Sequence, residues 1–292
     1  PSSAASDVYK RQYDAFVIAL LMLGIALFVT EYLSEEKIQT KRTMVSILAM
    51  VVGCFSKAVY IPFLALYWLM PKDKFYSRRQ KNLFKAGIFV LLILMFASFI
   101  LPLIGNVTSG AEVGDYRGGD TSQTSQLSMI LGYPLTYTGV LLKSLGTTFA
   151  SYFIGSKVLA NFAYRGIYDG IGYFVVLLTM LFTFVTDFGM TEKTYDAQMK
   201  RKILMMKIWN AVLIFGTACL VWTALYLDFT PVGSMVINGV SPRYYLPLIF
   251  PLSLIFINQK VRCSMKLENY QSLIAFLMLI GTGISIYCLM LA

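Results

Sequence analysis

The sequence predicts an all-α protein, a polytopic bundle of transmembrane helices with about six full spans and one re-entrant pair of half-helices. Three observations lead to this fold class. Hydrophobic residues make up 57% of the 292 positions and charged residues only 14%, whereas soluble domains carry about 25% charged residues. Apolar runs long enough to cross a hydrocarbon core of about 30 Å recur along the chain. The lysines and arginines gather in the short loops between these runs, as they do on the cytoplasmic side of membrane proteins.

The distribution of positive charge sets the predicted topology. Of the 25 Lys and Arg residues, 17 fall in or beside four short loops. These loops are 34–43, 72–85, 187–202 and 259–268. Lys- and Arg-rich short loops stay in the cytoplasm, so we predict that the segments 106–133 and 228–242 lie outside. The net charge of +10 is therefore a topological signal, and we predict a lipid bilayer as a partner and no nucleic acid.

One apolar run, 44–70, is predicted to return to the side from which it enters. It is 27 residues long, and its single charge, Lys57, lies near the centre. Both flanks are rich in Lys and Arg, so both ends of the run should be cytoplasmic. Each arm of about 12 to 14 residues would extend only about 20 Å as a helix, which is too short for a crossing. We therefore predict two half-helices that meet at Ser56-Lys57, with Lys57 at the apex.

The other apolar runs supply the full spans and one ambiguous segment. The full spans are predicted at 13–33, 86–104, 170–186, 208–227, 244–258 and 272–292. The segment 127–153 is apolar but interrupted by Gly132, Pro134, Lys143 and Gly146. We expect it to form interfacial helices on the outer face, with a further span as the alternative. All these segments belong to a single transmembrane domain, 13–292.

The first twelve residues differ from the rest of the chain. They are polar and lack the apolar core of a signal peptide. Residues 7–12, DVYKRQ, resemble the translation of a transposon end sequence that serves as an adapter in sequencing libraries. We therefore expect residues 1–12 to be adapter-derived and unpacked, and the chain to be the C-terminal part of a longer protein. A disordered natural tail is the alternative.

The content of metal-binding and nucleophilic residues excludes several kinds of site. The chain has no histidine, which excludes histidine-based metal sites, catalytic triads and imidazole general bases. Its four cysteines are far apart and have neither metal-ligand spacing nor the pattern of a disulfide framework. We predict no metal and no cofactor.

Three charged groups lie where a membrane makes them costly, and such groups usually line a cavity or pair with a partner. Lys57 lies at the predicted apex, Asp14 at the outer start of the first span, and Arg243 at the head of a later span. Each also has a purely structural interpretation. Lys57 could extend to the interface and Asp14 could cap a helix. Arg243 could be an interfacial anchor beside Tyr244.

Five short motifs, in order, resemble a family of bacterial membrane proteins. They are Tyr13-Asp14-Ala15, Ser56-Lys57-Ala58-Val59-Tyr60-Ile61-Pro62, Pro71-Lys72-Asp73-Lys74-Phe75, Gln126 followed by Tyr133-Pro134, and Gly239-Val240-Ser241-Pro242-Arg243-Tyr244-Tyr245-Leu246-Pro247. Over about 13–252 this set is similar to the domain of unknown function 2142 family, which is grouped with the GT-C glycosyltransferases. Family members usually have Gln-Gly where this chain has Ser241-Pro242. The catalytic acid of GT-C enzymes lies in a first outer loop, which we expect to be missing here.

The resemblance implies a GT-C-like glycosyltransferase of the bacterial plasma membrane. Such an enzyme takes a sugar from a polyprenyl-phosphate donor at the outer face and passes it to a glycan or lipid acceptor, in the assembly of cell-surface polysaccharide or cell-wall glycan. The implied substrate-binding residues are Lys57, Tyr60, Gln126, Arg243 and Tyr244, with Lys57 and Arg243 on phosphate. Asp14 matches the outer-face acid and is the candidate catalytic residue. The alternatives are a transporter or flippase for a lipid-linked or anionic substrate, and a non-catalytic scaffold.

Cysteine labelling from either side of the membrane tests the topology. In a background without the native cysteines, a cysteine in place of Ser77 should react only from the cytoplasmic side, because the re-entrant run returns there. A cysteine within 106–133 should react only from the outside and is the matched control. Reaction of the cysteine at position 77 from the outside would contradict the re-entrant pair, since a single crossing of 44–70 would put it there.

Overall fold

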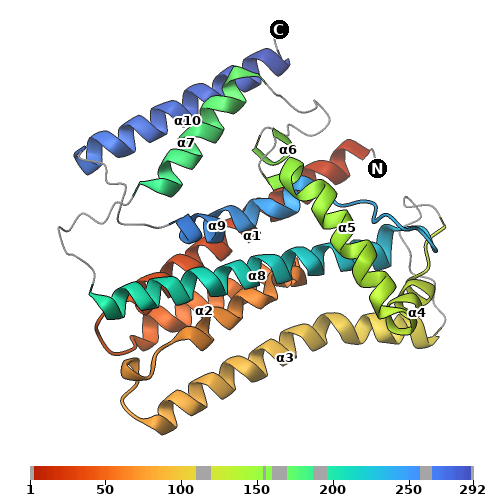
Figure 1. The fold of residues 1–292 in the computed structure, drawn as a ribbon, viewed down its shortest axis with the longest axis horizontal. Helices are drawn as coiled ribbons and strands as arrows, with labels where there is room; N and C mark the ends of the chain where they lie inside the picture. The colour runs from red at the N-terminus through yellow and green to blue at the C-terminus, as the bar shows by residue number, and fades with distance from the viewer. Residues whose placement is uncertain are drawn as a thin grey trace. The chain divides into compact units, whose positions relative to one another are not determined.

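The computed structural model describes residues 3–109, 120–153, 156–159, 170–186, 196–256 and 265–290. Every regular element within these residues is a helix (Figure 1), which confirms the all-α fold class. The chain divides into two compact units. The first consists of Pro1–Leu145 and Arg201–Val240, and the second of Gly146–Lys200 and Ser241–Ala292.

The first unit holds three of the predicted full spans. Its elements are α1 (Ser3–Leu33), α2 (Thr40–Phe55), the 3-10 helices η1 (Ala58–Leu69) and η2 (Lys72–Lys74), α3 (Arg78–Ser109), α4 (Gln123–Gly132), the first part of α5 (Pro134–Phe153) and nearly all of α8 (Ala197–Phe229). Helices α1, α3 and α8 are long and apolar enough to cross a membrane. They correspond to the spans predicted at 13–33, 86–104 and 208–227.

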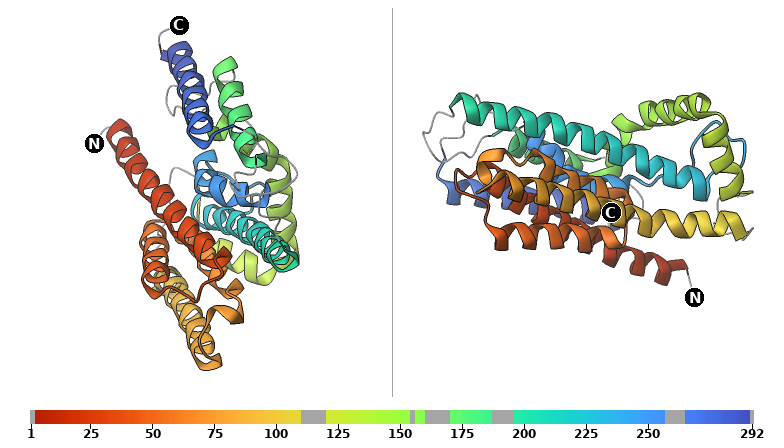
Figure 2. Two further views of the ribbon diagram at one scale, coloured as in Figure 1. Left: turned by 90° about the vertical axis from the view of Figure 1, so that its left-hand side faces the viewer. Right: turned by 90° about the horizontal axis from the view of Figure 1, so that it is seen from below.

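The run 44–70 breaks where the sequence predicts. Helix α2 ends at Phe55, Lys57 is extended at φ −149° and ψ 90°, and η1 begins directly after it. The two arms contact each other, and further views show them side by side with α1 (Figure 2). Beyond the two arms, the N–H of Ile38 donates to the carbonyl of Lys74 at 2.9 Å. The chain therefore leaves the hairpin at the end where it entered, as the re-entrant interpretation requires.

The second arm is a 3-10 helix rather than an α-helical half-helix. It has twelve residues, although 3-10 runs usually end after three or four. Pro62 lies inside it and lacks the N–H that an α-helical hydrogen bond would need. Packing against α1, α2 and α3 stabilises the arm. Six of its side chains are at most 1% exposed, namely Tyr60, Ile61, Phe63, Leu64, Leu66 and Tyr67.

Small residues let α1 and α2 approach each other closely. The hydroxyl of Ser46 donates to the carbonyl of Gly24 at 2.5 Å. A Cβ on Gly24 would lie 2.5 Å from Cγ of Met50, and one on Gly53 would lie 3.1 Å from Cβ of Leu20. Lipid is as apolar as the helices, so close backbone approach and packing, rather than a hydrophobic force, hold membrane helices together.

Helix α4 and the chain that follows α8 meet at one end of the first unit. The side-chain amide of Gln126 donates to the carbonyls of Thr230 and Pro231 at 2.9 and 3.1 Å. The described parts of 106–133 and 228–242, both predicted to lie outside, therefore meet at one end of the unit.

The ambiguous segment 127–153 forms two helices, as its glycines and proline suggest. Helices α4 and α5 are separated at Tyr133, immediately before Pro134. Helix α4 has ten residues, about half of what a crossing needs. The placement of both helices in the outer interface stays a prediction.

The second unit holds the last predicted span and two shorter helices. Its elements are the end of α5, α6 (Ser156–Leu159), α7 (Ile171–Val185), the start of α8, the 3-10 helix η5 (Pro242–Leu248), α9 (Ile249–Phe256) and α10 (Leu267–Met290). Helix α10 is long and apolar enough to cross a membrane, and it corresponds to the span predicted at 272–292. Helices α7 and α9 have 15 and 8 residues, fewer than the roughly 20 of a perpendicular crossing. Four of the six predicted spans thus have helices of full length, and 170–186 and 244–258 contain shorter ones.

Helices α7 and α10 pair through glycines. A Cβ on Gly172 would lie 2.5 Å from the carbonyl oxygen of Gly281 and from Oγ of Ser285, and one on Gly281 would lie 2.8 Å from Cγ2 of Val176. The two helices run side by side over much of their length (Figure 1). The second unit therefore uses the same small-residue packing as the first.

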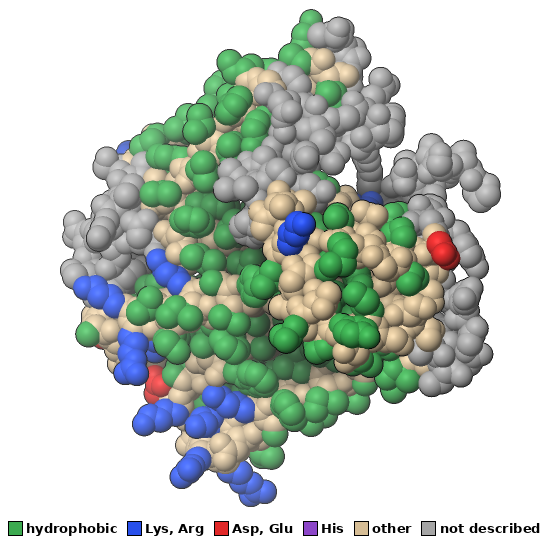
Figure 3. Space-filling view, turned by 45° about the vertical axis from the view of Figure 1, so that its right-hand side comes forward, with side chains coloured by type: hydrophobic (Ala, Val, Ile, Leu, Met, Phe, Trp, Pro, Cys, Tyr) green, Lys and Arg blue, Asp and Glu red, His purple; other side chains and the backbone are tan. Residues whose placement is uncertain are grey.

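The long helices present apolar surfaces. On α3, Leu94 and Leu101 are 62% and 64% exposed. Apolar side chains cover wide areas of the face in Figure 3, and Lys and Arg gather near one edge. Soluble monomers rarely expose contiguous apolar areas of this kind. A lipid bilayer covers such surfaces, as expected for a multi-pass membrane protein.

The N-terminal segment is helical where the structure describes it. Helix α1 begins at Ser3, so helical backbone runs through most of the segment 1–12 that is predicted to be an adapter-derived or disordered tail. The side chains of residues 1–13 lie outside the described part of the chain. The absence of packed contacts for this segment stays a prediction.

A leucine in place of Gly24 tests the close approach of α1 and α2. We expect Gly24→Leu to lower the free energy of unfolding in mixed micelles by about 1 to 3 kcal/mol, because the larger side chain overpacks the interface. Gly87→Leu on α3 is the matched control, since a Cβ there would meet nothing within 4 Å. Equal stability of the two variants would show that α1 and α2 do not depend on this contact.

Candidate functional site

Lys57 and Asp14 form an ion pair that joins the apex of the α2–η1 hairpin to α1. The ammonium of Lys57 donates to Oδ1 of Asp14. The two side chains are 9% and 13% exposed, so the pair is largely buried. A charged group at membrane depth is expected to find a partner, and the structure supplies one from a residue 43 positions away.

The backbone at the apex keeps its own hydrogen bonds. The N–H of Lys57 donates to the carbonyl of Cys54 at 3.0 Å, and its carbonyl accepts from the N–H of Tyr60 at 3.3 Å. Main-chain groups at membrane depth have no water to bond, so a break in a helix is tolerated only where the protein satisfies them. The side chain of Lys57 does not cap η1 and is engaged with Asp14 instead.

Two predicted substrate-binding residues lie in the packed interior. Tyr60 is fully buried within η1, and Gln126 is fully buried where α4 meets the chain after α8. The Gln126 amide holds the carbonyls of Thr230 and Pro231, and its Oε1 accepts no hydrogen bond from any residue that the structure describes. In this conformation both side chains support the fold, and their contact with a substrate stays a prediction.

The remaining two predicted residues, Arg243 and Tyr244, belong to η5 in the second unit. The guanidinium carbon of Arg243 lies 5.6 Å from the centre of the Tyr244 ring, within the range of a cation–π interaction. Both side chains are half-buried. Since Lys57 belongs to the first unit, the implied binding of phosphate by both Lys57 and Arg243 stays a prediction.

A second charged cluster, at the other end of α1, is absent from the predicted site residues. Glu31 is 1% exposed. Its Oε1 accepts from the N–H of Gln39 at 3.0 Å, and its Oε2 lies 3.4 Å from Nη1 of Arg42. The same argument that singled out Asp14 applies to Glu31, because it is an acid inside the apolar run FVTEYL. The carboxylate ties the loop before α2 to the end of α1.

Lys74 completes this cluster from the far end of the hairpin. Its side chain is buried, and Nζ donates to the carbonyl and hydroxyl of Ser34, both at 2.6 Å, and to the carbonyl of Glu36 at 3.0 Å. These three acceptors match the three donors of an ammonium group. Burial lowers the pKa of Lys74 below its ordinary value, and the negative charge of Glu31 opposes this shift. We call Glu31, Ser34, Glu36, Arg42 and Lys74 the base cluster, because it closes the base of the hairpin.

The base cluster extends to α8 through Asp73. Nζ of Lys202, near the start of α8, lies 3.8 Å from Oδ2 of Asp73. The hydroxyl of Tyr32 donates to the main-chain carbonyl of Lys202 at 3.1 Å. The described parts of the loops 34–43, 72–85 and 187–202, all predicted to be cytoplasmic, therefore meet at one end of the first unit.

No group of three or more Cys, Asp or Glu residues in the described part of the chain could hold a metal ion. At the hairpin apex, the first unit sets the carboxylate of Asp14 beside the ammonium of Lys57. These are the groups that a reaction on a phosphate-bearing substrate would use.

The apolar helices, the Lys- and Arg-rich loops and the buried ion pairs define a multi-pass integral membrane protein. A family model described as "Predicted membrane protein (DUF2142)" matches residues 10–252, which is most of the chain. The protein therefore belongs to this family, the domain of unknown function 2142 that its motifs resemble. No curated protein and no solved structure matches the chain.

A double-mutant cycle tests the coupling of Lys57 and Asp14. We expect Lys57→Met alone to lower the free energy of unfolding by on the order of 3 kcal/mol, because it leaves a buried carboxylate without its partner. The double variant Lys57→Met/Asp14→Asn should recover a large part of this loss. Lys41→Met, which removes an exposed charge, should stay within about 0.5 kcal/mol of wild type. Additive effects of the two substitutions would contradict the pair.

Proposed function

We propose that this protein is a membrane-embedded transferase that uses a polyprenyl-phosphate-linked sugar at the outer face of the bacterial plasma membrane. The product would serve in cell-surface polysaccharide or cell-wall glycan assembly. The observation that carries this proposal is the Lys57–Asp14 pair at the break between α2 and η1. It sets an acid and a cation side by side in an otherwise apolar region, at the predicted outer start of α1.

The pair has the groups that glycosyl transfer needs. The bond between the anomeric carbon and the phosphate oxygen breaks, the phosphate leaves with the electron pair, and the acceptor oxygen forms the new bond. Lys57 would stabilise the charge that develops on the departing phosphate. Asp14 would accept the proton of the acceptor hydroxyl. The resemblance to GT-C enzymes implies a further acid in a preceding outer loop, which would take or share this second role.

The ion pair also lowers the free-energy cost of bringing the carrier phosphate to Lys57. Separating two buried charges leaves each one uncompensated, at a cost of several kcal/mol. When the carrier phosphate reaches Lys57, however, the ammonium exchanges one anion for another, and the carboxylate becomes available to the acceptor. Arg243 would be the second phosphate ligand, since its planar fork binds two oxygens at once whereas Lys57 acts as a point charge.

A transporter or flippase for a lipid-linked or anionic substrate is the second candidate. The hairpin favours it, because discontinuous helices with polar groups at the break form substrate sites in many transporters. Against it, the sequence has no visible inverted repeat. The two candidates differ in whether a covalent bond is made, and this difference decides the experiment.

Sugar transfer in membranes that contain the protein tests the proposal. Polyprenyl-phosphate sugars labelled on the sugar are supplied to these membranes, and label in glycan or lipid acceptors is measured. Transfer is expected with wild type and should fall about 100-fold or more in Lys57→Met and in Asp14→Asn. Lys41→Met at the opposite end of the hairpin should keep full activity.

Two results would overturn parts of the proposal. Movement of the labelled donor between leaflets without label in any acceptor would identify a flippase instead of a transferase. Full transfer by a Lys57→Met protein would reduce Lys57 to a structural partner of Asp14. The level of folded protein in the membrane is measured in parallel, because loss of the ion pair also lowers stability.

A further inference from the structure

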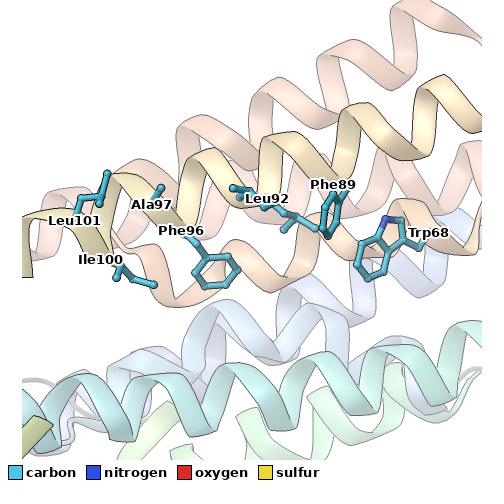
Figure 4. A pocket seen from close by; sticks show the side chains of 8 residues that line it. Trp68, Phe89, Leu92, Phe96, Ala97, Ile100 and Leu101 are labelled. Carbon is cyan, nitrogen blue, oxygen red and sulfur yellow. The ribbon is translucent and has the colours of Figure 1, made fainter. Parts of the chain in front are cut away.

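An apolar groove runs along α3 in the first unit and is independent of the Lys57 site. It has a volume of about 480 Å³, and its lining includes Trp68 from η1 and Phe89, Leu92, Phe96 and Ile100 from α3. Figure 4 shows these side chains in sequence along the helix, with Trp68 at one end and Leu101 at the other.

The groove continues a basic stripe on the same helix face. Phe89, Leu92, Phe96 and Ile100 follow one another at intervals of three and four residues, which places them on one side of α3. The same spacing, continued toward the start of the helix, reaches three basic residues. These are Lys85, Lys81 and Arg78. One face of α3 is therefore basic over its first turns and apolar from Phe89 onward.

Lys85 lies at the mouth of the groove. Its Nζ donates to the main-chain carbonyl of Trp68 at 3.0 Å, and the Trp68 ring stacks on that of Phe89 with centroids 6.4 Å apart. An ammonium has three donors, and the hydrogen bond to Trp68 is the one that Lys85 makes within the described residues. Tryptophan is enriched at the depth of the lipid headgroups, which is where a headgroup beside Lys85 would lie.

The dimensions of the groove suit one leaflet of the bilayer. Twelve residues separate Phe89 from Leu101, or about 18 Å of helix, and half of a hydrocarbon core is about 15 Å. Lys81 and Lys85 are one helical turn apart, so their positive charges repel each other unless an anion lies between them. A ligand with an anionic head and an apolar chain of leaflet length is complementary to both parts of this face.

We propose that the groove binds one anionic glycerophospholipid from the leaflet on the side of the Lys- and Arg-rich loops. Its acyl chain lies along Phe89 to Leu101, and its headgroup contacts Lys81 and Lys85. A zwitterionic lipid has the same chains but no net charge, so Lys81 and Lys85 provide the discrimination. Basic pockets beside transmembrane helices on the cytoplasmic side bind anionic headgroups in this way.

Quenching of Trp68 fluorescence by brominated lipid tests the proposal. The protein is placed in bilayers of phosphatidylcholine with a minor fraction of phosphatidylglycerol. Bromine is carried on the acyl chains of one lipid or of the other at equal mole fraction. We expect brominated phosphatidylglycerol to quench about ten times more effectively per lipid than brominated phosphatidylcholine, given two basic residues at the headgroup. The difference should disappear in Trp68→Phe, because the groove is then without its fluorophore.

Charge variants show whether the preference belongs to this groove. Lys81→Gln/Lys85→Gln should bring the two lipids to equal quenching, while a glutamine at position 85 can still donate to the Trp68 carbonyl. Lys41→Gln/Lys72→Gln removes two exposed charges that lie outside α3 and should keep the preference. Equal quenching by both lipids in wild type would overturn the proposal. So would a preference that survives in Lys81→Gln/Lys85→Gln or in Trp68→Phe, or one that is lost in the control.

Discussion

The structure depends on one constraint, that the chain must turn back inside an apolar environment without leaving polar groups unsatisfied. At the turn, Lys57 carries both a charge and main-chain groups that no longer belong to a helix. The bonds to Cys54 and Tyr60 satisfy the main chain, Asp14 neutralises the charge, and the arms pack against α1 and α3. Backbone that is neither helix nor barrel is tolerated at membrane depth only under such conditions.

Helix α1 is held to the hairpin at two places. Asp14, in its first half, pairs with the apex, and Glu31, near its end, binds the chain that enters α2. The buried Lys74 then closes the base by holding the loop after α1. The two acids lie 17 positions apart, about 25 Å along a helix, which is close to the length of each arm. The charges therefore set the register of the hairpin against α1, and the glycine contacts between them allow the close approach.

The sequence predicted the position of the break and four full-length helices, because hydropathy and the Lys/Arg bias report these directly. The assignment of the two sets of loops to opposite faces stays a prediction. It did not predict the 3-10 form of η1, which depends on Pro62 and on packing from three other helices. The sequence also did not identify Asp14 as the partner of Lys57, because no local sequence pattern links two residues 43 positions apart. Glu31 was missed although its signal was present, because an acid at the end of a span looks like the start of a loop. Tyr60 and Gln126 were singled out because they belong to family motifs. A motif, however, does not show whether a residue contacts a ligand or the protein interior.

The hairpin has a consequence for how the protein enters the membrane. In the predicted topology, a segment that enters and leaves on the same side adds no crossing of the membrane. Helices α1 and α3, which flank it in the chain, therefore run in opposite directions, as consecutive spans do. In this predicted topology, none of the residues from Ile38 to Lys74 has to be translocated. Lys57 would then reach its depth from the cytoplasmic side during or after synthesis, once α1 is in place to receive it, and the orientation of every later helix would be independent of whether the hairpin has already folded.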